Sequence, residues 1–226
     1  MVRRGGWLDA VAAMVWKDFM LDARRKVEAS SVVVFSAASG VLVAYILGGV
    51  AGISPAAVAV AASLVMVFLA VFGSLSSFVR EADRGTLEGL RVSPVGPEAI
   101  YLAKLVYSYA LIASATLVYL AVTAVFANLW ELLSPASLAA SLSAGLYLAA
   151  VSSLTSAILV FSEARGILMP VMVLVLSLPY IQLAAPVLTQ VYSGAGSAFS
   201  AVVLGLASAA FIAVALWLSR FILEAA

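Results

Sequence analysis

The sequence predicts an all-α integral membrane protein in which six transmembrane helices follow an amphipathic helix at the membrane interface. Hydrophobic residues make up 65% of the chain and charged residues only 10%, whereas soluble domains carry about 25% charged residues. Two long segments, residues 29 to 79 and 166 to 219, contain no Asp, Glu, Lys or Arg. Each is long enough for two spans, because a helix crosses the hydrocarbon core in about 20 residues.

The composition also excludes several kinds of chemistry. The chain has no cysteine and no histidine, which excludes disulfides, thiol nucleophiles, a Ser-His-Asp triad and the usual zinc sites. We therefore predict no metal site and no catalytic residue. No predicted span carries a charged residue near its centre, as an intramembrane enzyme would require. We also expect no nucleic acid among the partners.

The first predicted element is an amphipathic helix over residues 7 to 27. Its apolar residues recur every three or four positions and form one continuous stripe that includes Trp16 and Phe19. The charged positions lie mainly on the other side: Asp9, Lys17, Asp18, Asp22 and Arg25. This pattern predicts a helix lying in the membrane interface. The alternative is an amphipathic helix packed on a soluble neighbour.

Turn residues divide the apolar segments into six predicted spans. Glycines and a proline interrupt the first long segment at residues 48 to 55, and Gly194 and Gly196 interrupt the last. The helix of the third span starts near Pro97, because proline is favoured at the first position of a helix. Lys104 near its entrance can extend toward the interface. The predicted spans are 31 to 49, 56 to 78, 98 to 127, 136 to 161, 167 to 189 and 197 to 219.

The basic residues predict the orientation of these spans. With six spans, all 12 Lys and Arg residues fall on one side of the membrane. Cytoplasmic loops carry an excess of Lys and Arg. We therefore expect a protein of the cytoplasmic membrane with both termini and the segment 80 to 97 in the cytoplasm.

One strongly charged segment, residues 80 to 94, joins the second and third predicted spans. Charged groups are costly at the hydrocarbon centre, so this segment lies in water. On a short helix, Arg80 could pair with Asp83 or Glu81 with Arg84, and Gly85 would then end the helix. An ordinary polar loop has the same composition. Our interpretation is that a soluble partner binds this segment.

Seven residues of this segment form the pattern E-x3-G-x-L-E-x-L-x2-S-P, which is followed by Lys104 at the start of the next span. They are Glu81, Gly85, Leu87, Glu88, Leu90, Ser93 and Pro94. The pattern resembles the first cytoplasmic loop of ABC-2-type permeases. The chain length, the six spans and the segment from 16 to 25 make the chain most similar to the family of cytochrome c maturation protein B, the haem exporter permease subunit.

This resemblance implies a permease subunit that binds no cofactor itself and works with a separate ABC ATPase subunit like cytochrome c maturation protein A. It also implies a homodimer, a coupling loop over residues 80 to 97, and cytochrome c maturation proteins C and D as further partners. The absence of a G-x4-G-K-[ST] motif agrees, because ATP must then bind to another chain. Haem is the candidate substrate, either delivered across the membrane or released outside it. The alternatives are an ABC-2 permease for a lipid-linked glycan or a drug, and a membrane assembly factor that transports nothing.

Prolines in the fifth predicted span suggest where a substrate could pass. Pro170, Pro179 and Pro186 predict a kinked or interrupted helix, and broken helices commonly line the substrate path of transporters. Pro179, Tyr180 and Gln182 are the candidate path residues. The alternatives are a kinked helix satisfied by its neighbours and a tyrosine that anchors the interface. The serine-rich fourth span is interpreted as a packing surface, with a polar cavity lining as the alternative.

Overall fold

The computed structural model describes residues 7–24, 26–50, 54–76, 78–83, 85, 95–196 and 198–225, and all regular structure within these ranges is helical. The elements are α1 (Trp7–Arg24), α2 (Lys26–Val50), α3 (Pro55–Ser76), α4 (Phe78–Asp83), α6 (Pro97–Ala127), the short 3-10 helix η1 (Trp130–Leu133), α7 (Pro135–Leu159), α8 (Arg165–Tyr192) and α9 (Ala198–Ala225). The all-α class predicted from the sequence is confirmed.

Six of the described helices are long and apolar enough to cross a membrane. The segments are Ser30–Gly48 in α2, Pro55–Leu75 in α3, Pro97–Ala127 in α6, Pro135–Leu159 in α7, Arg165–Tyr192 in α8 and Phe199–Ile222 in α9. Their number agrees with the six spans that the hydrophobic segments predict.

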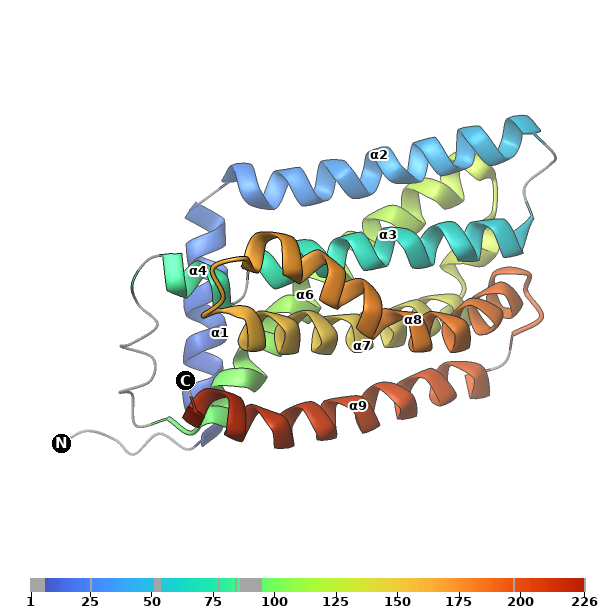
Figure 1. Cartoon of the computed structure of the whole chain (residues 1–226). Helices are drawn as coiled ribbons and strands as arrows, with labels where there is room; N and C mark the ends of the chain where they lie inside the picture. The colour runs from blue at the N-terminus through green and yellow to red at the C-terminus, as the bar shows by residue number, and fades with distance from the viewer. Residues whose placement is uncertain are drawn as a thin grey trace.

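The spanning helices lie side by side, and α1 crosses one end of the bundle at a steep angle (Figure 1). The same end holds α4 and the end of α9, and we call it the α1 end. The connection between α6 and α7 and the turn between α8 and α9 lie at the opposite end (Figure 1). This arrangement brings the charged N-terminal helix next to the segment that follows the second span.

The serine-rich helix α7 lies at the centre of the bundle, in contact with α3, α6, α8 and α9. Within its spanning window 72% of the residues are buried, against 17% in α2. Its buried small polar residues are Ser137, Ser141, Ser152, Ser153, Thr155 and Ser156. Because small side chains let helices approach closely, these positions serve helix packing, which is the interpretation favoured by the sequence.

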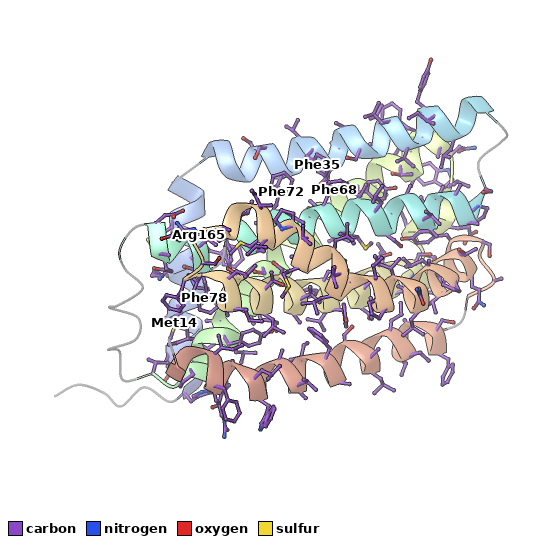
Figure 2. All side chains as sticks on the ribbon, viewed as in Figure 1. Met14, Phe35, Phe68, Phe72, Phe78 and Arg165 are labelled. Carbon is purple, nitrogen blue, oxygen red and sulfur yellow. The ribbon has the colours of Figure 1, made fainter. Side chains whose placement is uncertain are left out.

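The peripheral helix α2 packs against α6 and α3. A Cβ atom added to Gly40 would lie 3.1 Å from the carbonyl oxygen of Tyr119 and from Oγ1 of Thr123, so only glycine fits this approach without displacement. On its other flank Phe35 contacts Phe72 of α3, with ring centroids 5.8 Å apart (Figure 2).

The proline-containing helix α8 is one continuous helix that bends along its course (Figure 1). The sequence allowed either a kink or an interruption at its prolines, and the interruption is wrong. Pro170, Pro179 and Pro186 stand about two turns apart, so the backbone hydrogen bonds between them can hold the helix together.

Candidate functional site: a buried charge cluster at the α1 end

Helix α1 lies with an apolar surface partly uncovered. Trp16 is 68% exposed and Phe19 is 43% exposed, whereas Val11 is buried against Ala99 and Ala103 of α6. The apolar stripe predicted from the sequence is therefore divided between the bundle and the surroundings. The charged side of α1 does not all face water either, because Asp18 is buried.

Four charged side chains from three helices meet beneath α1. The ammonium of Lys104 on α6 lies 2.8 Å from Oδ2 of Asp18 on α1 and 3.0 Å from Oε1 of Glu81 on α4. Lys17 reaches the same Glu81 oxygen at 2.6 Å and lies 3.6 Å from Oδ1 of Asp18. We call Lys17, Asp18, Glu81 and Lys104 the charge cluster.

The charge cluster is neutral in sum and mostly shielded from solvent. The side chains of Lys104, Asp18 and Glu81 are 3%, 5% and 7% exposed, and only Lys17 at 41% extends toward the surface. Removing ions from water is expensive unless each ion meets an opposite charge in good geometry. Lys104 donates to both carboxylates, so it compensates the two buried anions together.

Lys104, which the sequence predicts can extend toward the interface, ends on buried carboxylates of α1 and α4. It is the eighth residue of α6, about 10 Å along the helix from its start, and its ammonium turns inward to the two carboxylates. In this position the lysine compensates two carboxylates that would otherwise be buried without a partner from α6. In the sequence, a lysine eight residues into an apolar helix was the signal that could have pointed to a buried acidic partner such as Asp18.

Helix α4 is fixed in place by more than the charge cluster. Phe78 is fully buried among Ile100, Ala157 and Val160, and its N–H donates to Oγ of Ser156 at 3.0 Å. At the other end of α4, Asp83 pairs with Arg165 at the start of α8. Figure 2 shows Phe78 and Arg165 at the α1 end, near Met14. This short helix is thus attached to α1, α6, α7 and α8.

The structure places only two of the seven motif residues. Glu81 belongs to the charge cluster, and Gly85 ends α4 with a φ of 66° and an N–H donated to the carbonyl of Ala82. The other five lie outside the described residues: Leu87, Glu88, Leu90, Ser93 and Pro94. Of the two pairings predicted within the loop, neither can be followed, since Arg84 and the side chain of Arg80 also lie outside the described residues.

The three candidate substrate-path residues do not share one surface. Pro179 and Gln182 are exposed on α8, whereas Tyr180 is 4% exposed. The ring of Tyr180 stacks on Tyr147 at 3.9 Å, and its hydroxyl lies 3.2 Å from Oγ of Ser208. The side chain of Tyr180 therefore packs against α7 and α9. Pro179 and Gln182 face outward on α8.

Among the described residues, no group of three or more His, Cys, Asp or Glu side chains could hold a metal ion. The charge cluster contains two carboxylates, but lysines occupy the positions that a cation would take. Its side chains join α1, α4 and α6.

The fold and the charge cluster define a polytopic α-helical membrane protein with a buried group of charged side chains at one end of the bundle. The model of one protein family, described as CcmB protein, matches residues 9–226. The chain belongs to the CcmB family, as the resemblance of its loop and N-terminal segment implied. Membership implies a permease subunit of a haem-exporting ABC transporter that serves cytochrome c maturation. Among curated proteins, none matches the chain.

Proposed function

We propose that a separate ATPase subunit, like cytochrome c maturation protein A, binds the loop of residues 80 to 97 and drives this permease through α4. The observation that supports this is the attachment of α4 to four other helices by the charge cluster, the Asp83–Arg165 pair and the buried Phe78. Because α4 is held at several points, a displacement of the loop by the ATPase would also move the helices of the bundle.

In the proposed orientation the α1 end faces the cytoplasm. By the six-span prediction all 12 Lys and Arg residues fall on one side of the membrane, and the distribution of basic residues in membrane proteins favours the cytoplasm for that side. The exposed Trp16 and Phe19 would place α1 in the interface of the cytoplasmic leaflet. Both termini would be cytoplasmic, where the ATPase acts.

We also propose that two copies pair in the transporter and that a substrate path lies between them. An amide such as that of Gln182 is costly against lipid, where its donors and acceptors have no partner. Pro179 and Gln182 face outward on α8, so a second subunit would complete the surface they offer. Tyr180 would support this wall from behind through its stacking on Tyr147.

Haem is the proposed cargo, and this chain would hold it without tight axial ligation, because the sequence has no histidine. This suits either delivery of haem across the membrane or its release from an acceptor outside. Cytochrome c maturation proteins C and D are the proposed further partners.

The test is co-expression with the ATPase subunit, followed by co-elution in detergent and measurement of haem-stimulated ATP hydrolysis. We expect both to be lost when residues 86 to 94 are replaced by a Gly/Ser linker, and in Glu88→Lys. Tyr45→Phe, at an exposed tyrosine of α2, is the control and should retain both.

The other possible results of this experiment favour the alternative functions. Association without haem stimulation would favour an ABC-2 permease for another substrate, such as a lipid-linked glycan or a drug. Failure of the correctly inserted protein to bind the ATPase would favour an assembly factor that transports nothing.

A further inference from the structure

A cleft opens at the end of the bundle opposite α1, between α7, α9 and the turn that follows α8. Its volume is about 810 Å³, and small or aliphatic residues form most of its walls. Ala139 of α7 faces it from one side, and Ala201 and Gly205 of α9 line the other. Val202 and Leu206 also line the cleft and are 52% and 66% exposed, so it opens sideways to the surroundings of the spanning helices.

Glu131 lies at this cleft as an isolated negative charge. It is the only charged residue between Lys104 and Glu163 in the sequence. Its side chain lies over the turn after α8, because a Cβ atom added to Gly194 would approach Oε2 to 3.3 Å. Gly194 has a φ of 75°, which favours glycine and permits this approach. Among the ion pairs of the described residues, none includes Glu131.

The negative charge at the cleft argues against haem and against a second copy of the chain as its occupant. Haem carries two propionates, which the Glu131 carboxylate would repel, and the lining residues include no methionine or tyrosine that could reach an iron. A second copy in the same orientation would bring no cation, since its loops at this end carry no Lys or Arg.

An ammonium group joined to an apolar chain fits both features of the cleft. The ammonium can donate charge-assisted hydrogen bonds to the Glu131 carboxylate, and the hydrocarbon can lie against the aliphatic walls. Lipids reach such a site from the bilayer because the cleft opens past Val202 and Leu206. We propose that the cleft binds a phospholipid with a primary-amine headgroup, one acyl chain lying between α7 and α9.

The test is native mass spectrometry of the purified chain in detergent with added phosphatidylethanolamine, phosphatidylcholine or phosphatidylglycerol. Wild type should retain phosphatidylethanolamine about tenfold better than the other two, as a hydrogen bond to a charged group allows. The quaternary amine of phosphatidylcholine cannot donate such a bond. Glu131→Gln should abolish the preference.

Two further variants distinguish recognition of the lipid headgroup from binding of the acyl chain. Glu163→Gln makes the same chemical change at the α1 end and should leave the preference intact. Gly205→Leu should lower retention of all three lipids, because the nearest atom to a Cβ there is Oγ of Ser143 at 3.8 Å and a longer side chain would extend into the cleft. Equal retention of the three lipids by wild type, a preference that survives Glu131→Gln, or displacement of the lipid by haem would overturn the proposal. None of these readouts depends on the ATPase.

Discussion

At the level of single residues, Lys104 compensates two buried carboxylates at once. Its ammonium lies within 3.0 Å of both Asp18 and Glu81, and 3% of its side chain is exposed. A buried carboxylate that loses its partner keeps the full cost of having left water. The stability of the α1 end should therefore respond strongly to this one side chain.

We predict that Lys104→Met lowers the free energy of unfolding by about 3 to 5 kcal/mol, the usual result of removing one partner of a buried ion pair. Thermal unfolding of the purified protein in detergent measures this. Arg220→Met is the matched control, since the side chains of the Arg220–Glu98 pair are 60% and 32% exposed and ion pairs in contact with solvent contribute about 0 to 1 kcal/mol. The double variant Asp18→Met/Lys104→Met should recover part of the loss. Equal losses in Lys104→Met and Arg220→Met would contradict the role of the charge cluster.

A second residue-level prediction concerns Tyr180. Tyr180→Phe removes a buried hydroxyl that meets Oγ of Ser208 and the carbonyl of Ser143, and should cost about 1 kcal/mol of stability. Because the ring still stacks on Tyr147, haem-stimulated ATP hydrolysis in the complex with the ATPase should be unchanged. Tyr45→Phe, at an 80% exposed tyrosine, is the control. Lost stimulation with unchanged stability would instead indicate that Tyr180 contacts the substrate.

At the level of elements, the helices were predictable and the partners of their side chains were not. Hydropathy and turn residues such as Gly96-Pro97 depend on neighbours in the sequence, so they predict where a span lies. The pairing of Asp18 with Lys104 depends on how α1 crosses the bundle, which no periodic pattern contains. For the same reason the sequence separated the charged positions of α1 from its apolar stripe without predicting that Asp18 is buried. The motif residues pointed to Glu81 and Lys104 only through resemblance to a family.

The close contact between α2 and α6 leads to a prediction about stability. Gly40→Leu should lower stability by about 1 to 3 kcal/mol, as overpacking commonly does, because even a Cβ atom there would lie 3.1 Å from the backbone of α6. Gly166→Ala is the control, since no atom lies within 4 Å of its added Cβ. Thermal unfolding in detergent compares the two. If Gly40→Leu is as stable as wild type, α2 does not approach α6 as closely as described.

At the level of the whole molecule, the distribution of charge predicts the orientation in the membrane. The chain has no cysteine, so a single introduced thiol reports its own position. Ser193→Cys, in the turn after α8, should react in intact cells with a maleimide that cannot cross the membrane. Glu163→Cys, in the turn before α8, should react only after the membrane is opened. The reverse pattern would show that the α1 end faces outward.

The charge cluster also sets an order for biosynthesis. Lys104 follows Asp18 by 86 residues and Glu81 by 23, so both carboxylates leave the ribosome before the buried lysine that joins them, and only Lys17 of the charge cluster precedes them. While the first two spans enter the membrane, α1 has no buried counter-ion to dock on. The first helix to be made thus reaches its final position only after the third span is inserted. A chain that stalls before residue 104 would leave the charge cluster with two carboxylates against Lys17 alone, and a quality-control protease would distinguish it from the finished protein by this excess negative charge.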